Sequence, residues 1–306
     1  MKAFIIRTAN WLLRHTAFMW SDSMFVHLQF WINNGYRLDL NHPKTFCEKI
    51  QWLKLNNRRE EFTIMVDKVD AKEYVASVIG SQYIIPTLGV WNSFDEIDFN
   101  ELPDGFILKC AHDSSKGVVC RDKTALDKKK VKRRMEFFQR KTFYKQNREY
   151  PYKNVPHRLI AEKFLVNGTD SELKDYKFYC FNGRAEYCQL IANRSTDETI
   201  DFYDRNWKHQ EFIGLLPIVH HAPIAHHAST VHHMPEHYNQ MLEVADKLAS
   251  SINTPFVRID LYNVNGKIYF GEITFFPNSG IGKFSPDEWN MKLGDYINLE
   301  NRKQND

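Results

Sequence analysis

Two neighbouring β-rich segments near the C-terminus place charged side chains within otherwise apolar sequence. Arg258 and Asp260 lie two residues apart in one segment, and Glu272 and Thr274 lie two residues apart in the next. Side chains alternate between the faces of a strand, so each pair shares one face. Buried carboxylates favour neutralisation by a metal, and Mg²⁺ prefers carboxylate oxygens together with nucleotide phosphates. The pattern predicts a magnesium–nucleotide site, although from spacing alone a surface ion pair at a strand edge fits as well.

The turn between these two segments decides which side chains meet. A two-residue Asn-Gly turn would place Asp260 opposite Gly271 and would point Glu272 away. A three-residue turn over 264–266, with its glycine left-handed, aligns Arg258 with Glu272. We therefore expect the longer turn.

A lysine and a polar turn form a second candidate site. Lys109 ends the apolar segment 106–110, directly before a polar turn that contains Ser114, Ser115 and Gly117. Such a lysine can reach phosphates that backbone N–H groups of the turn cover. The sequence contains no P-loop motif and no G-x-G-x-x-G motif, which removes those phosphate sites as alternatives. It also lacks G-x-S-x-G and H-E-x-x-H, which disfavours hydrolase and zincin functions.

The helices and strands that must position these residues are mixed along the chain. Thr45 and Glu48 form a capping box, so we expect a helix from about residue 46. The Asn182-Gly183 pair predicts a hairpin. Apolar spacing predicts the remaining elements: helices over 67–79, 124–140, 235–251 and from 286, and strands over 83–90, 106–110, 118–119, 158–165, 176–181, 184–192, 256–262 and 267–275. The expected fold is mixed α/β (α+β), with interleaved subdomains.

The order of these motifs resembles the ATP-grasp superfamily, and more closely the TupA-like ATP-grasp family of polysaccharide-biosynthesis proteins. The resemblance covers about residues 35–299. Seven segments carry it: PKTFCEKI at 43–50, DK at 67–68, FILKC at 106–110, AEKFL at 161–165, DYKF at 175–178, RIDLY at 258–262 and FGEIT at 270–274. It implies an N-terminal helical and α/β region over 1–104, a small lid subdomain over 105–165, and a larger antiparallel-sheet core over 166–306 that carries the metal site.

The resemblance also implies roles for individual residues. The expected ATP contacts are Lys68, Lys109, Ser114, Ser115, Gly117, Glu162, Lys163, Phe164, Leu165 and Asp175, of which 162–165 form the adenine and ribose hinge. The expected catalytic cations are Lys177, Arg194 and Arg258, and the expected ligands of one or two Mg²⁺ ions are Asp260, Glu272 and, more weakly, Thr274. Many superfamily members carry Asn at this last position, which puts a second metal site in doubt.

The reaction implied by the resemblance is ATP-dependent carboxylate–amine ligation. The acid attacks the γ-phosphate of ATP, and an amine captures the acyl phosphate, releasing ADP and phosphate. The implied substrates are small-molecule or saccharide, with an amino acid or amine joined to a uronic-acid sugar during capsular or cell-wall polysaccharide synthesis. One alternative is a glycosyltransferase or a kinase of the same pathway, although no Asp-x-Asp triplet supports the former. The other is a non-catalytic binding module.

Composition limits the partners and the cellular compartment that we expect for the protein. The 306 residues include 41 basic and 38 acidic side chains, a balance that does not call for a nucleic-acid partner. Five cysteines without a C-x-x-C pair disfavour a disulfide scaffold and a zinc ribbon, and they fit the cytoplasm. Residues 1–20 are apolar and basic but do not resemble a signal peptide. This segment either packs on the body of the protein, which is the commoner outcome, or lies on the inner face of the membrane.

Two further charged stretches remain. The basic run 128–134 is typical of a solvated helix face, and the alternative is a docking surface for a membrane or another anionic partner. Histidine doublets stand at 220–221, 226–227 and 232–233. We expect an irregular loop near the mouth of the active site, with a zinc or nickel site as the less favoured reading.

Overall fold

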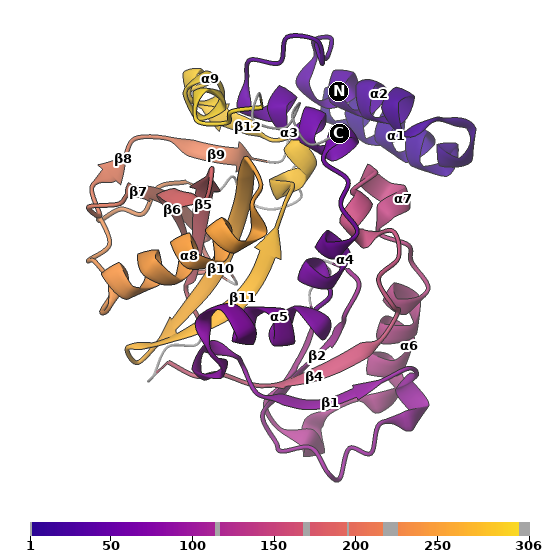
Figure 1. Ribbon diagram of the computed structural model, residues 1–306. Helices are drawn as coiled ribbons and strands as arrows, with labels where there is room; N and C mark the ends of the chain where they lie inside the picture. The colour runs from indigo at the N-terminus through magenta and orange to yellow at the C-terminus, as the bar shows by residue number, and fades with distance from the viewer. Residues whose placement is uncertain (1, 114–116, 168–171, 195, 217–225, 300–306) are drawn as a thin grey trace.

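The computed structural model of the protein describes residues 2–113, 117–167, 172–194, 196–216 and 226–299. Its helices are α1 (Lys2–His15), α2 (Asp22–Asn34), α3 (Phe46–Asn56), α4 (Glu61–Val66), α5 (Asp70–Ile79), α6 (Lys128–Gln139), α7 (Tyr144–Asn147), α8 (Tyr238–Ile252) and α9 (Glu288–Asp295). Its strands are β1 (Thr87–Trp91), β2 (Phe106–Cys110), β3 (Val118–Cys120), β4 (Leu159–Lys163), β5 (Asp175–Phe181), β6 (Arg184–Ala192), β7 (Thr199–Asp204), β8 (His209–Gln210), β9 (Ile213–Leu216), β10 (Phe256–Val264), β11 (Lys267–Thr274) and β12 (Lys283–Ser285). Figure 1 shows the N-terminal helices at one end, the larger sheet in the middle and a smaller sheet at the other end.

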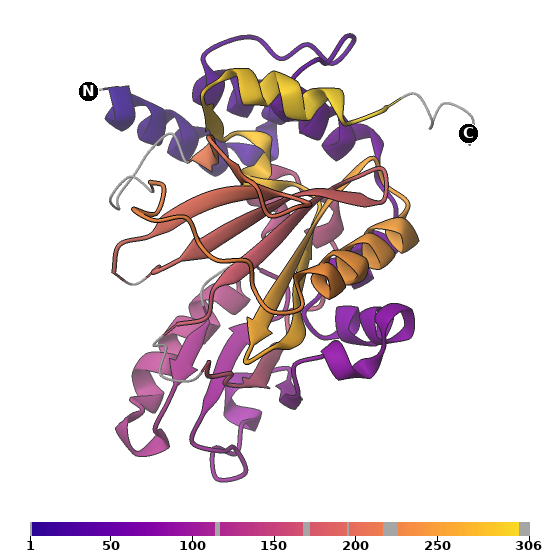
Figure 2. The same cartoon turned by 90° about the vertical axis from the view of Figure 1, so that its left-hand side faces the viewer.

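The larger sheet is antiparallel and has the strand order β11-β10-β5-β6-β7-β8. Helix α8 packs along one face, where Phe178 stacks on Tyr238 (Figure 2). On the other face, Phe46 of α3 contacts the rings of Tyr179 and Phe181. This aromatic cover ends along β5, and the same face continues with charged residues. The packing therefore leaves one part of the sheet open for a polar site.

The predicted capping box at Thr45 and the predicted Asn182-Gly183 hairpin are both present. The side chain of Thr45 accepts a hydrogen bond from the Glu48 backbone, and Glu48 accepts one from the Thr45 backbone, so the capping box is present. Asn182 and Gly183 join β5 to β6 with φ values of 50° and 85°. Two successive left-handed residues are what a two-residue hairpin turn requires.

The smaller sheet has the order β1-β4-β2-β3, and all its pairs are antiparallel. Val131 and Met135 of α6 pack against it. β1 precedes residue 105, where we expected the lid to begin, yet it pairs with β4 across register positions such as Trp91 and Leu159. The smaller sheet therefore includes a strand from the region before residue 105. The order of elements in the sequence does not predict this pairing.

The turn between β10 and β11 differs from the prediction. Val264 pairs with Lys267, so Asn265 and Gly266 form a two-residue turn, and the three-residue turn is wrong. A register shift after Asp260 compensates, because Gly271 is an extra residue in β11 and Asp260 pairs with Glu272. An added Cβ on Gly271 would lie 3.0 Å from the Asp260 carbonyl oxygen, so glycine suits this bulge.

The N-terminal segment packs only part of its apolar surface on the rest of the protein, and its membrane association stays a prediction. Leu13 of α1 is buried against α2, whereas Phe4, Leu12 and Phe18 are exposed. In the basic run of α6, Lys132 pairs with Asp95, and the helix otherwise presents a solvated face. Over the described ranges, no helix has the length and apolar character needed to cross a membrane.

Candidate active site

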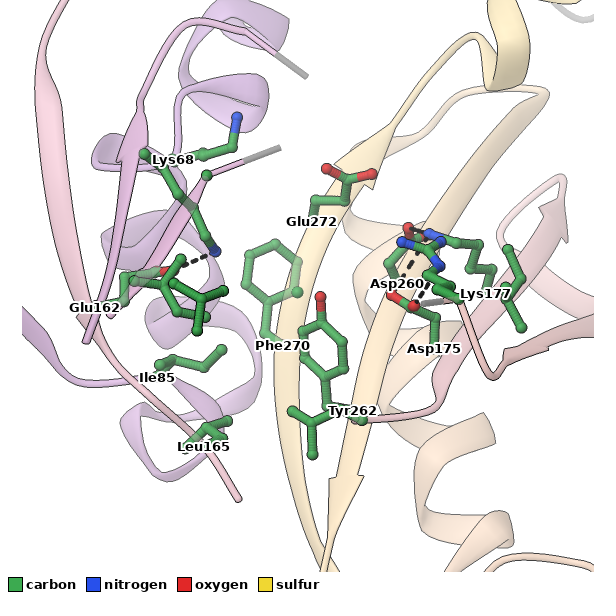
Figure 3. A pocket seen from close by; sticks show the side chains of 18 of the residues that line it. Lys68, Ile85, Glu162, Leu165, Asp175, Lys177, Asp260, Tyr262, Phe270 and Glu272 are labelled. Atoms are coloured by element: carbon green, nitrogen blue, oxygen red, sulfur yellow. Dashed lines mark hydrogen bonds and ion pairs between the residues drawn. The ribbon is translucent and has the colours of Figure 1, made fainter. Parts of the chain in front are cut away.

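A cleft of about 1160 Å³ separates the smaller sheet from the larger one (Figure 3). Most of the residues that the sequence singled out line it: Lys68, Lys109, Gly117, Glu162, Lys163, Phe164, Leu165, Asp175, Lys177, Arg194, Arg258, Asp260 and Glu272. Ser114 and Ser115 lie outside the described residues. The fold therefore brings together side chains separated by about two hundred positions in the sequence.

We call the side of the cleft formed by the smaller sheet and α5 the lid wall, and the side formed by the larger sheet the core wall. The lid wall carries one carboxylate between two lysines. Lys109 of β2 and Lys72 of α5 donate to the two oxygens of Glu162, each at 2.6 Å. Burial by itself would raise the pKa of Glu162, but the two ammonium groups outweigh it and the pKa lies below its ordinary value. Lys72 also donates to the Ile85 carbonyl oxygen, at 2.8 Å, which fixes its direction. This arrangement keeps Glu162 ionised and leaves the wall with an excess of positive charge.

Lys68 lies on the same wall, at the start of the chain segment that leads into α5. Its ammonium donates to the carbonyl oxygen of Asp113, the last described residue before the polar turn. Burial lowers the pKa of Lys68, and the nearby Glu272 and Asp113 carboxylates oppose that shift. The contact holds the lysine beside the turn that sequence analysis associated with phosphate.

The core wall is built on β5, β10 and β11. Arg258 donates to both oxygens of Asp260, from Nε at 2.6 Å and from Nη2 at 2.8 Å. Lys177 of β5, which pairs with Asp260 in the sheet, also donates to it. Asp260 is 3% exposed, and burial raises its pKa while Arg258 and Lys177 oppose the shift. The carboxylate is thus enclosed by cations on its own sheet.

Glu272 stands beside this group and faces the cleft. Its side chain is 42% exposed and accepts from Arg258 Nη2 at 3.0 Å. The Thr274 hydroxyl, which does not line the cleft, donates to Glu272 at 3.1 Å and accepts from Arg258 at 3.0 Å. Desolvation would raise the pKa of Glu272, but Lys177, Arg258 and Lys68 lower it to about 2. Glu272 is therefore an ionised carboxylate available to a cation in the cleft.

A third acidic position extends the core wall. Asp175 accepts from Arg194 Nε at 3.1 Å, and its other oxygen lies 4.0 Å from Lys177 Nζ. Arg194 is partly exposed, since 39% of its side chain is accessible. If Arg194 turned toward a ligand, Lys177 would remain near the buried Asp175 carboxylate, at 4.0 Å.

Apolar side chains form one end of the cleft, around Leu165. Leu165 follows β4 and packs in one cluster with Ile85, which lies on the lid side, and with Tyr262. Phe270 of β11 faces them, as Figure 3 shows. An apolar slot next to charged walls suits a ligand with a flat ring at one end and anionic groups at the other.

Four residues of this site did not emerge from the sequence: Lys72, Ile85, Tyr262 and Phe270. Of the two aromatic residues, Tyr262 had a signal, because it lies two positions from Asp260 and so shares its face. The bulge at Gly271 separates Phe270 from Glu272, so period two does not place these two on one face. Lys72 and Ile85 had none, because their roles depend on how α5 and its following segment meet β4.

The oxygen donors of the core wall fit a hard divalent cation. Glu272 and Asp260 pair directly across β10 and β11, and Glu272 opens to the cleft. Carboxylates of this kind, completed by nucleotide phosphates and water, are the usual surroundings of Mg²⁺. The Asp260 carboxylate would be shared between such an ion and the Arg258 guanidinium, which donates to both of its oxygens.

The described part of the histidine stretch, residues 226–233, does not line the cleft, and its first doublet, 220–221, lies outside the described residues. For residues 226–233 the expected place near the mouth of the active site was wrong, because β7 and β8 hold this segment on the opposite side of the sheet.

Two sheets that close on a cleft with lysines on one wall and carboxylates on the other define an ATP-grasp architecture. The family model described as TupA-like ATPgrasp matches residues 48–298. The chain belongs to this family, as its motifs predict. A search of curated proteins found no match.

Solved structures with a similar backbone include D-alanine–D-alanine ligase from Bacillus anthracis complexed with ATP, at 14% identity and a TM-score of 0.42, covering 76% of this chain and 63% of that one. The L-amino acid ligase from Bacillus licheniformis has 11% identity and a TM-score of 0.42, covering 90% and 56%. N5-carboxyaminoimidazole synthetase from Staphylococcus aureus has 13% identity and a TM-score of 0.40, covering 69% and 44%. The chain spans less than two thirds of the length of each. The family match carries the assignment.

Proposed function

We propose that this protein is an ATP-dependent carboxylate–amine ligase that binds Mg-ATP in the cleft between its two sheets. The observation that carries the proposal is the pairing of unlike walls: lysines Lys68 and Lys109 on the lid side, and the carboxylates Asp260 and Glu272 on the core side, line one cleft. A nucleotide polyphosphate and its metal need both kinds of partner.

In this proposal the nucleotide base occupies the apolar slot beside Leu165 and Phe270, and the hinge 162–165 contacts the base and ribose. The phosphates extend toward Lys109 and Lys68, with the turn that contains Gly117 beside them. Glu272 and Asp260 hold Mg²⁺, which when bound neutralises phosphate charge. The lid subdomain, assigned to 105–165 with β1 added, closes over a core that begins near residue 166.

The remaining cations support transfer of the γ-phosphate to a carboxylate. Arg258 and Lys177 are fixed by hydrogen bonds to Asp260, so they need little reorganisation as negative charge develops. Arg194, which is partly exposed and paired with the buried Asp175, lies at the accessible edge, where it can orient the acid substrate. Positioning and charge neutralisation suffice for this chemistry, so no protein nucleophile is required.

The proposed product is an amide. The acid and amine are small-molecule or saccharide substrates, and we assign the acid to a uronic-acid sugar and the amine to an amino acid or related compound of capsular or cell-wall polysaccharide synthesis. Support for this class comes from the resemblance of the motifs to the polysaccharide-biosynthesis branch of the superfamily. The cleft adds support to this assignment through its length and its two charged walls.

The direct test supplies purified protein and Mg-ATP with a matrix of uronic acids and amines, and quantifies ADP and free phosphate together. A ligase releases both in equal amounts, and only when acid and amine are present. ADP without free phosphate identifies a kinase. Sugar transfer without ATP use identifies a glycosyltransferase, and absence of Mg-ATP binding leaves a non-catalytic module.

We also propose that the N-terminal segment, residues 1–20, holds the enzyme at the inner face of the membrane. Phe4 and Phe18 are 72% and 88% exposed, and residues 1–20 contain basic but no acidic side chains. Exposed aromatic groups next to positive charge suit an anionic lipid surface. Co-sedimentation with phosphatidylglycerol vesicles, lost in a Phe4→Ser/Phe18→Ser variant, would support this; equal sedimentation of both proteins would contradict it.

A further inference from the structure

A buried carboxylate on the far side of the larger sheet gathers three histidines from two parts of the chain. Ile200 of β7 lines the nucleotide cleft, so its neighbour Asp201 points to the opposite face, where α8 packs. Asp201 is 2% exposed. Its Oδ1 accepts from His209 Nε2 of β8 and from His227 Nδ1, each at 2.9 Å. Ligand atoms of these three residues lie within 4.8 Å of one another.

A fourth side chain completes the cluster. His232 Nε2 lies 3.8 Å from Asp201 Oδ2, is buried, and has no hydrogen-bond partner among the described residues. The backbone of His232 is fixed at both ends, because its N–H donates to the Tyr203 hydroxyl at 3.0 Å and its carbonyl accepts from Trp207 Nε1 at 2.9 Å. Buried polar atoms normally have partners, so this nitrogen points to a missing one.

The donor set has a definite preference among metals. Imidazole nitrogens with one carboxylate suit Zn²⁺ and related transition metals, whereas Mg²⁺ takes oxygen ligands. Four protein ligands form a closed tetrahedral shell, with neighbouring ligand atoms about 3.3 Å apart. The distances from the Asp201 oxygens to the histidine nitrogens, 2.9 Å for His209 and His227 and 3.8 Å for His232, lie on either side of that value. A simpler account makes Asp201 only an acceptor for two histidine N–H groups, but it leaves His232 Nε2 unexplained.

We propose that Asp201, His209, His227 and His232 form a zinc-type metal site separate from the nucleotide cleft. The ion ties the segment 226–233 to the β7–β8 edge. That segment leads from β9, whose Leu215 lines the cleft, to α8. The site is structural, because its four ligands leave no open position for a substrate.

The histidine doublets supply their own controls. In each described doublet one ring joins the cluster and the other is exposed: His227 against His226, and His232 against His233. His226 instead contacts Asp197, at 3.0 Å. Replacing either exposed histidine therefore removes an imidazole of the same stretch and keeps the rings of all proposed ligands. His226 Nδ1 also contacts the His227 backbone carbonyl oxygen, at 2.7 Å, so His233→Gln is the cleaner of the two controls.

The experiment titrates chelator-treated full-length protein with Zn²⁺ alone, against a chromophoric competitor, in excess Mg²⁺ so that the carboxylates of the cleft are occupied. One Zn²⁺ per chain is expected. Asp201→Asn and His227→Gln should weaken binding at least about 100-fold, since even loss of an outer-shell partner costs 10- to 100-fold. His226→Gln and His233→Gln should bind like the original protein. Co²⁺ should give the intense visible absorption of a tetrahedral site.

Either of two results would overturn the site: Zn²⁺ affinity equal in His227→Gln and His226→Gln, or no stoichiometric binding by the original protein. His227 is partly exposed, so its variant remains testable if Asp201→Asn does not fold. Metal-free melting curves of the two His→Gln variants check that both fold alike. Mg-ATP binding is measured separately, and its failure would leave the zinc result unaffected.

Discussion

The two walls of the cleft each hold a buried carboxylate bonded to two cations, yet they differ in charge and in what they leave accessible. On the lid wall, Glu162 is shared by Lys72 and Lys109, and its pKa is lowered. On the core wall, Asp260 is bonded to Arg258 and Lys177, its pKa is raised, and a second carboxylate, Glu272, stands beside it.

This difference indicates how a nucleotide and its metal are divided between the walls. The lid wall has more positive than negative groups and suits phosphate. The core wall balances its charges but presents the ionised Glu272 to the cleft, which suits a cation. Mg-ATP satisfies both walls at once, because its phosphates are anionic and its ion is cationic.

The largest expected effect follows from changing the core wall. Glu272→Gln should lower kcat at least about 1000-fold, because it removes the accessible ligand of an ion that stabilises developing charge. The melting temperature should change little, since Glu272 is partly exposed. Steady-state kinetics and a thermal melt measure both, and near-normal turnover would refute the metal assignment.

Asp260→Asn should abolish turnover as well, but with a loss of stability. Asp260 neutralises Arg258 and Lys177 within the sheet, so its removal leaves buried cations without a full counter-charge. Breaking such a pair costs about 3 kcal/mol. Urea unfolding compares this variant with Glu272→Gln, and equal stability would contradict the distinction between the two carboxylates.

On the lid wall, Glu162→Gln should cost about 2 kcal/mol of stability, because two lysines lose their shared acceptor. It should also change how stability depends on pH. A lowered carboxyl pKa stabilises the fold above the unfolded value near 4.5 and loses that contribution as pH falls through the folded pKa. The stability advantage of the original protein over Glu162→Gln should therefore be largest above about pH 4.5 and should shrink as pH falls further. Urea unfolding at several pH values measures it, and a difference that does not change with pH would contradict the prediction.

The smallest effect is expected at the bulge that aligns the carboxylates. In Gly271→Ala, the new Cβ would lie 3.0 Å from the Asp260 carbonyl oxygen and 3.1 Å from Tyr262, so β11 must shift by a few tenths of an ångström. We expect a decrease in kcat of about tenfold. Gly105→Ala is the matched control, because its nearest contact would be an ordinary 3.5 Å. Equal kcat values in both variants would contradict a role for the bulge in aligning the carboxylates.

Local patterns were enough to predict many elements, and they failed where partners come from distant sequence. The capping box at Thr45 and the Asn182-Gly183 hairpin depend on neighbouring residues, and both are present. The β10–β11 register depends instead on a bulge at Gly271, which no turn rule predicts. The sequence therefore indicated that Glu272 belongs near Arg258, but by an incorrect turn.

The site shows the same division. Its charged residues could be selected from sequence because strands 258–262 and 270–274 carry them at period two within apolar runs. Lys72 and Ile85 could not, because they reach the cleft only through the packing of α5 and its following segment against β4. The histidine stretch was misplaced for a similar reason, since the face that Asp201 occupies follows from the pairing of β7.

The most direct test of the two-wall account is calorimetric titration of ATP into the original protein, Glu272→Gln and Glu162→Gln, each with excess Mg²⁺ and with EDTA. We predict that Mg²⁺ strengthens ATP binding at least about tenfold in the original protein and in Glu162→Gln, and has little effect in Glu272→Gln. The same Mg²⁺ dependence in Glu272→Gln as in the original protein would contradict the assignment of the core wall to the metal.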